Sequence, residues 1–112
     1  MQTVVETPSY LADAEKLFTE DERKAIVDQI ANDPLCGVVI PGTHGIRKVR
    51  VGFDGRGKRG GARMIYVFFG DDMPIFLLAA FAKNERADLT PKERAALGKV
   101  VLTMVEDYRK LT

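Results

Sequence analysis

The sequence has little of the chemistry that most enzymes use: it contains one cysteine, one histidine and no tryptophan. The lone cysteine, Cys36, excludes an internal disulfide, and one cysteine with one histidine cannot build a zinc site. His44 alone also excludes a histidine pair for general acid–base catalysis, and no pair of catalytic carboxylates is evident. The longest apolar run, Ile75 to Ala82, is too short to span a bilayer. We therefore expect no metal, no cofactor and no membrane partner.

Size and composition indicate an ordinary globular protein. The chain has 112 residues, of which 46% are hydrophobic and 29% charged, and these values are typical of a single domain with its own core. We treat residues 1–112 as one domain. The first residues, MQTVVE, lack the basic region and the long apolar stretch of a secretion signal. The expected location is the cytoplasm.

The net charge of +1 hides an uneven distribution. Residues 44–63 hold seven cations and one anion, whereas residues 1–40 hold three cations and eight anions. Within the basic part, residues 55–63 read GRGKRGGAR, with four glycines and four cations in nine positions. A concentrated positive zone attracts phosphates, and glycines let a backbone approach a polynucleotide closely. A solvated surface loop is the alternative interpretation of this segment.

The apolar pattern predicts an α+β domain with the order strand, two helices, three antiparallel strands and a helix. We expect a short strand at residues 3–5, helices beginning after Thr7 and Thr19, strands at 46–53, 62–69 and 75–82, and a last helix after Thr90. Pro8 and Pro91 suit the first helical position, and threonine followed three residues later by glutamate forms a capping box at Thr19 and Thr90. The run 75–82 is apolar on both faces, as expected of a central strand covered on both sides.

The expected hairpins bring basic side chains together. If the turn after the 62–69 strand is centred near Asp72, Arg63 pairs near residues 81–83. If the basic loop is centred near residues 57–58, Arg63 also lies close to Arg50 on the preceding strand. Arg50, Arg63 and Lys83 should therefore meet at one end of the sheet. The loop that carries Arg56, Lys58 and Arg59 should cap the same end.

Such a cluster suits cleavage of RNA without a metal. RNA supplies its own nucleophile, the 2′-hydroxyl group, and arginine forks can stabilise the charge that builds on the phosphate oxygens. Neighbouring cations disfavour the charged form of an amine, which lets a lysine exchange protons near neutral pH. Lys58 and Lys83 are the candidates for that role. Tyr66 is a candidate for stacking on a base, or else a core aromatic, and His44 is a candidate proton shuttle or a plain loop residue.

Three segments together resemble the HigB-type branch of the RelE/ParE toxin superfamily. They are residues 40–50 (IPGTHGIRKVR), residues 55–66 (GRGKRGGARMIY) and residues 82–90, where AKNE is followed by DLT. The match covers residues 40–90, and the flanking helices fit in order and length. The GRGKRG string also resembles a dinucleotide-binding motif, but it lies between two strands instead of before a helix.

The resemblance implies a toxin of a type II toxin–antitoxin pair that enters the ribosomal 30S A site and cuts translated mRNA. Its partners would be the ribosome, mRNA and a cognate HigA-like helix-turn-helix antitoxin. By resemblance, the basic positions of the family fall on Lys48, Arg50, Arg63 and Lys83 and on the loop cations Arg56, Lys58 and Arg59. Together with the chemistry above, we assign Arg63, Lys58 and Lys83 as catalytic, and we assign as RNA- or ribosome-binding Arg47, Lys48, Arg50, Arg56, Arg59 and Tyr66.

The resemblance is incomplete at two places, so alternatives stay open. The chain has His44 where the family motif has glycine, and the C-terminal segment offers only Asn84, Arg86 and Arg109 for a second catalytic residue. The general base is therefore not assigned. One alternative is a ParE-like inhibitor of DNA gyrase that does not cut RNA. The other is a nucleic-acid-binding module without activity.

Overall fold

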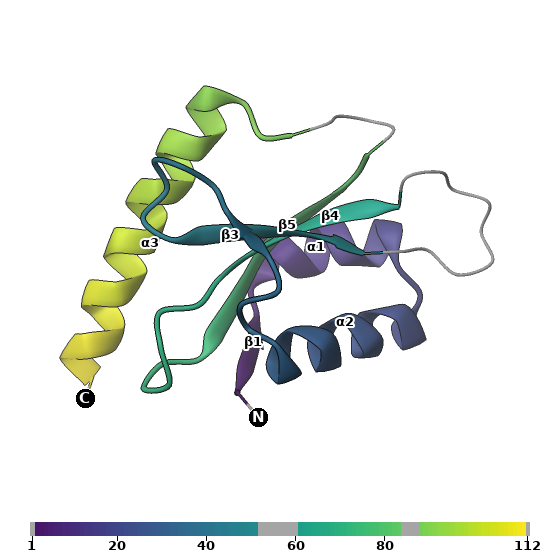
Figure 1. Cartoon of the computed structure of the whole chain (residues 1–112), viewed down its shortest axis with the longest axis horizontal. Helices are drawn as coiled ribbons and strands as arrows, with labels where there is room; N and C mark the ends of the chain where they lie inside the picture. Colours follow the sequence, from purple (N-terminus) through teal and green to yellow (C-terminus); the bar gives the residue numbers. More distant parts are fainter. Residues whose placement is uncertain (1, 52–60, 84–87, 112) are drawn as a thin grey trace.

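The fold is described from a computed structural model, for residues 2–51, 61–83 and 88–111. Its elements follow the expected order, with one additional short strand after the second helix (Figure 1). They are β1 (Val4–Glu6), α1 (Pro8–Leu17), α2 (Glu20–Asn32), β2 (Val38–Val39), β3 (Ile46–Val51), β4 (Ala62–Val67), β5 (Ile75–Ala82) and α3 (Pro91–Leu111). None of the helices in these ranges is long and apolar enough to cross a membrane.

The strands form one mixed sheet in the order β1-β5-β4-β3-β2. The β3–β4 and β4–β5 hairpins are antiparallel, as predicted, but β1 pairs in parallel with β5. The predicted α+β fold is therefore confirmed, but the predicted antiparallel sheet is corrected in two details. It is mixed, and it gains the edge strand β2, which is antiparallel to β3. Two exposed valines give β2 no alternation of apolar and polar residues, so the sequence pattern does not reveal it.

The helices begin where the capping residues predict. Thr7 accepts a hydrogen bond from the Tyr10 amide at the start of α1. Thr19 and Glu22 form the reciprocal capping box of α2. The same exchange occurs at α3, where the Glu93 amide donates to Thr90 Oγ1 over 3.1 Å and Glu93 Oε1 accepts from the Thr90 amide over 2.9 Å. These bonds satisfy amides that the helix itself leaves unpaired.

Helices cover both faces of the sheet. One core, which includes Tyr10, Ile26 and Tyr66, lies between the sheet and α1 and α2. The other, which includes Ile65, Phe81 and Val101, lies under α3 (Figure 1). β5 contributes buried side chains to both cores, which confirms its prediction as a central strand. Not every apolar residue of α3 lies in this core, because Val100 is 48% exposed.

A tight loop between β2 and β3 packs against the middle of α3. Thr43 is fully buried and donates through Oγ1 to the Ile40 carbonyl over 2.6 Å. His44 has a φ of 61°, a conformation that is uncommon for residues other than glycine. A Cβ atom added at Gly98 of α3 would lie 3.4 Å from His44 Cδ2 and 3.5 Å from the Gly42 carbonyl oxygen. The absence of a side chain at Gly98 therefore lets the helix backbone approach this loop closely.

Candidate functional site

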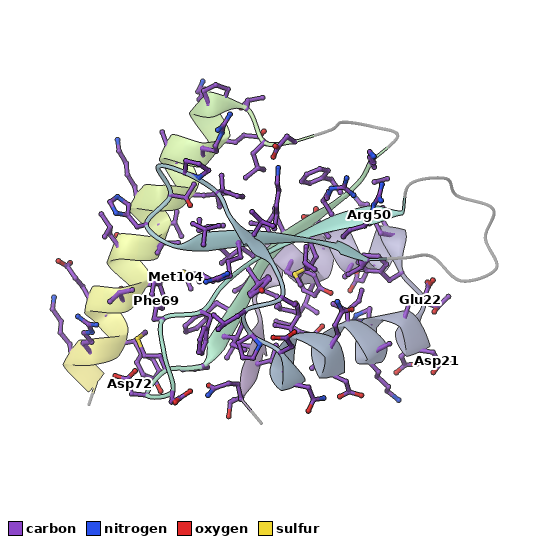
Figure 2. The ribbon with its side chains drawn as sticks, viewed as in Figure 1. Asp21, Glu22, Arg50, Phe69, Asp72 and Met104 are labelled. Carbon is purple, nitrogen blue, oxygen red and sulfur yellow. The ribbon has the colours of Figure 1, made fainter. Side chains whose placement is uncertain are left out.

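Two arginines face each other across the β3–β4 hairpin. Arg50 and Arg63 are direct partners in the antiparallel register, and Arg63 pairs on its other side with Phe81 of β5. Directly opposed residues project from the same face of a sheet with Cβ atoms about 5 Å apart, and like charges in that arrangement are destabilising. The fold therefore holds a pair of guanidinium groups together, at the end of the sheet where Figure 2 labels Arg50.

Arg63 is the more enclosed member of the pair. Its Nη1 atom is buried and has no hydrogen-bond partner among the described residues, whereas Arg50 is exposed. A buried guanidinium nitrogen without an acceptor is costly, and a phosphate oxygen is the kind of group that would satisfy it. The expectation that Arg63 pairs near residues 81–83 is confirmed.

Lys48 lies on the same face of β3, two residues before Arg50. Its Nζ atom is 2.5 Å from Oδ2 of Asp88, in the segment between β5 and α3. The hydrogen bond from Lys48 is the main reason why the pKa of Asp88 lies below its ordinary value. The charge of Arg94, on the first turns of α3, acts in the same direction. The structure thus adds a carboxylate to the predicted cluster.

Lys83 follows β5 directly and is exposed. Its backbone amide donates to the Gly61 carbonyl over 3.2 Å, so it lies level with the start of β4. Arg50, Arg63 and Lys83 therefore meet at one end of the sheet, as the hairpin geometry predicts. The loop cations Arg56, Lys58 and Arg59 lie outside the described residues, as do Asn84 and Arg86.

Arg47 does not lie with Lys48 and Arg50. Neighbouring residues of a strand point to opposite faces, and the Arg47 guanidinium donates to the Gly37 carbonyl over 2.7 Å on the side of α2. It is opposite Tyr66 in the register. The structure therefore separates Arg47 from the cluster and gives it a hydrogen bond within the fold.

The prediction that Tyr66 stacks on a base is wrong for this structure. Its side chain is fully buried, and its hydroxyl donates to the Pro34 carbonyl and accepts from the Gly37 amide, both over 2.8 Å. Burial raises the pKa of the Tyr66 hydroxyl above its ordinary range. Tyr66 fastens the segment before β2 to the middle of the sheet and offers no ring face to a ligand.

His44 also lies away from the cluster. It precedes β3, whereas Arg50 lies near the end of that strand. The rise of an extended strand places Ile46 and Arg50 about 13 Å apart, so direct proton exchange between His44 and the arginine pair is not supported. The cluster instead contains two residues that the sequence analysis did not single out, Asp88 and Arg94. The sequence pattern places Asp88 in the turn before the last helix, and its neighbours in the sequence do not predict a contact with Lys48, forty residues earlier.

Among the described residues, the exposed Arg50 and Lys83 give the site an open cationic surface. A groove of about 470 Å³ lies elsewhere, along α2, and is lined by Thr19, Asp21, Glu22, Ala25, Ile26, Gln29 and Val51. Its carboxylates, labelled in Figure 2, give it the opposite charge to the arginine pair. Among the described residues no three His, Cys, Asp or Glu side chains are grouped as a metal site requires. An exposed cationic surface of this kind fits a large anionic partner better than an enclosed small molecule.

The fold corresponds to that of a class of small toxins. The family model described as the RelE toxin of the RelE/RelB toxin–antitoxin system matches residues 20–110, and the chain belongs to this family. It is therefore the toxin of a toxin–antitoxin system. A mutant of the E. coli toxin RelE in the free state, carrying two arginine-to-alanine changes, has a similar structure, with a TM-score of 0.53. The two are 12% identical over 75% of this chain and 85% of the E. coli chain, a likeness that shows the shared fold.

Proposed function

We propose that this protein is a ribosome-dependent endoribonuclease that cuts translated mRNA in the 30S A site and so arrests growth. It would act in the cytoplasm and be neutralised by a cognate antitoxin, and by resemblance we assign it to the HigB branch with a HigA-like helix-turn-helix partner. The observation that carries the proposal is the opposed pair Arg50 and Arg63 on one face of the sheet. Membership of the RelE toxin family supports it.

The chemistry assigned to the site needs only the RNA and the basic side chains. The 2′-oxygen attacks the adjacent phosphorus atom, the bond to the 5′-oxygen breaks, and a cyclic phosphate remains. Arg63, with Arg50 beside it, would hold the phosphate and stabilise the charge that develops on its oxygens. One proton leaves the 2′-hydroxyl and another reaches the 5′-oxygen, and Lys83 and Lys58 are the groups proposed to exchange them. The ribosome would orient the message for in-line attack.

The test is to express the protein in a bacterium with and without Arg63→Ala and to map new 5′ ends on cellular mRNA. We expect the natural protein to create ends inside translated reading frames, and Arg63→Ala to reduce them at least about a hundredfold, as loss of a group that stabilises transition-state charge does. Arg63→Lys retains the positive charge but lacks the planar guanidinium group with its paired donors, so it should be more active than Arg63→Ala and less active than the natural protein. Lys99→Ala removes an exposed cation from α3 and serves as the matched control.

Each contrary result has a defined meaning. Undiminished cleavage by a well-expressed Arg63→Ala protein, with its melting temperature unchanged, would remove Arg63 from the site. Growth arrest with DNA damage and without new RNA ends would indicate a gyrase inhibitor of the ParE type. RNA binding without growth arrest would indicate a nucleic-acid-binding module that lacks activity.

A further inference from the structure

One carboxylate lies within the cationic surface and is held there from two sides. Asp88 Oδ2 contacts Lys48 Nζ at 2.5 Å, and Oδ1 accepts a hydrogen bond from the Leu89 amide over 2.8 Å. Leu89 is only 4% exposed and belongs to the core under α3. The buried leucine therefore fixes the backbone that presents the carboxylate to Lys48.

The fold has little need of this ion pair. The side chains of Lys48 and Asp88 are 32% and 42% exposed, and pairs in such solvent-accessible positions contribute little to folding stability. Capping does not require Asp88 either, because Thr90 and Glu93 already form the capping box of α3. The contact lies on the strand face that also carries Arg50 and Arg63.

The surroundings of Asp88 resemble those of a bound phosphate. Its carboxylate receives a lysine ammonium and a backbone amide, and Arg94 lies near enough to lower its pKa together with Lys48. These are the groups that hold phosphate oxygens in nucleic-acid complexes. An ionised carboxylate therefore already partners Lys48 in the ligand-free protein.

We propose that Asp88 is an internal counter-ion that competes with RNA phosphate for Lys48 and so limits the affinity of the site for RNA in general. The inference rests on the proposed function, since it concerns the RNA that this site takes. A phosphate that binds Lys48 must compete with the carboxylate for the ammonium group, and the cost of that competition falls on every RNA alike. An RNA held in place by the ribosome makes further contacts that offset this cost, whereas a free single strand does not. Asp88 is in this sense a specificity-determining residue.

Asp88→Asn tests the competition with minimal disturbance. The amide side chain has the same size, and its oxygen can still accept from the Leu89 amide, but it no longer neutralises Lys48. The probe is a labelled, short single-stranded RNA with 2′-O-methyl groups, which cannot be cleaved through its 2′-oxygens. Binding is measured by fluorescence anisotropy between about 50 and 200 mM salt. We expect Asp88→Asn to bind about fivefold more tightly at the lowest salt, with a log–log salt slope steeper by about 0.7, the value for one additional phosphate contact on a single strand.

Two further comparisons separate this effect from a change in net charge. Asp72→Asn removes one exposed negative charge in the turn before β5, at the opposite end of the molecule from Arg50 (Figure 2), and should leave the slope unchanged. In a Lys48→Met background, Asp88→Asn should no longer steepen the slope, because the competing cation is gone. Melting temperatures of all variants report whether each remains folded.

The inference is overturned if Asp88→Asn, still folded, binds RNA with unchanged or lower affinity, since Asp88 would then support the site or be irrelevant to it. It is also overturned if Asp72→Asn gives the same gain, or if neither the natural protein nor Asp88→Asn binds the probe. None of these outcomes touches the proposed nuclease activity, which depends on the mapped 5′ ends and on Arg63. Conversely, an absence of cleavage in cells with a normal Asp88→Asn effect would remove the proposed function and leave the counter-ion in place.

Discussion

At the scale of single residues, the same residue type can have different roles within one strand, as Arg47 and Arg50 do three positions apart. Lys48 and Arg50 lie on the face of the arginine pair. Arg47, directly before Lys48, instead donates a hydrogen bond to the carbonyl of Gly37. The sequence shows all three as one basic run, and the alternation of strand faces separates them. Tyr66 is a similar case. An aromatic residue beside a basic loop suggests base stacking, but its hydroxyl bonds at Pro34 and Gly37 show that it belongs to the core.

The position of Tyr66 leads to a prediction about stability. Tyr66→Phe removes the hydroxyl and leaves the buried Gly37 amide without that acceptor, so we expect the free energy of unfolding to fall by about 1–3 kcal/mol. Urea denaturation followed by circular dichroism measures the change. Tyr108→Phe is the matched control, because the Tyr108 ring packs edge-on against Phe76 through its carbon atoms. A loss of similar size in the control would show that the Tyr66 hydroxyl bonds are not the cause.

At the scale of elements, the sequence predicts local structure well and non-local pairing less well. Capping boxes, prolines and periodicity locate α1, α2, α3 and the three long strands, because these signals act within a few residues. The parallel pairing of β1 with β5 and the two-residue strand β2 depend on contacts between distant segments. The pairing of Arg63 with Arg50 could be anticipated because a hairpin fixes its register locally, but the contact between Asp88 and Lys48 could not.

The packing of α3 against the β2–β3 loop gives a second stability prediction. Gly98→Ala should raise the free energy of unfolding by about 0.5–1 kcal/mol, because alanine favours the helix over glycine and its Cβ would meet the loop only at 3.4 Å or more. Gly98→Leu extends beyond that contact and should destabilise the protein by about 1–3 kcal/mol. Thermal unfolding of the three proteins checks the order. If Gly98→Leu is as stable as Gly98→Ala, the loop does not restrict this face of α3.

At the scale of the whole molecule, charge is sorted by region. Residues 1–40 carry eight anions and three cations, and they supply α1 and α2, which cover the sheet face opposite to Lys48, Arg50 and Arg63. The sequence indicates this division, because the acidic and basic parts are separate along the chain. It does not show that the two parts lie on opposite faces, since that depends on how the helices pack. The result is a molecule with a charge dipole, which would orient its approach to an anionic surface.

The buried phenols give the whole fold a distinct response to alkali. Burial, with a further contribution from Glu6, raises the pKa of Tyr10 from 10.0 to about 12, and the pKa of Tyr66 is also raised. Above pH 10 the unfolded chain releases protons that the folded protein retains, so stability is complete below pH 10 and falls as the pH rises towards 12. Tyr10→Phe should flatten this decline, and it should not cost stability at neutral pH, because the Tyr10 hydroxyl is buried without a hydrogen-bond partner among the described residues.

Unfolding free energies measured by urea titration at several pH values between about 8 and 11.5 test this response. The decline should be steepest in the natural protein and in Tyr108→Phe, which retain both buried phenols. A decline of equal slope in Tyr10→Phe would show that other groups, such as the lysines, cause the alkaline loss.

The pairing along β3 also restricts how this site can vary. Lys48 and Arg50 occupy even-numbered positions, on the sheet face that also carries Arg63 of β4, while Arg47, Val49 and Val51 occupy odd-numbered positions and face α1 and α2. A single-residue insertion or deletion within the strand would exchange the two sets, burying cations and exposing valines. Related chains that keep this site should therefore differ in length within β3 by even numbers only, and odd changes should be confined to the connections between strands. The site therefore depends on the even or odd position of each residue along β3 as well as on the residue type.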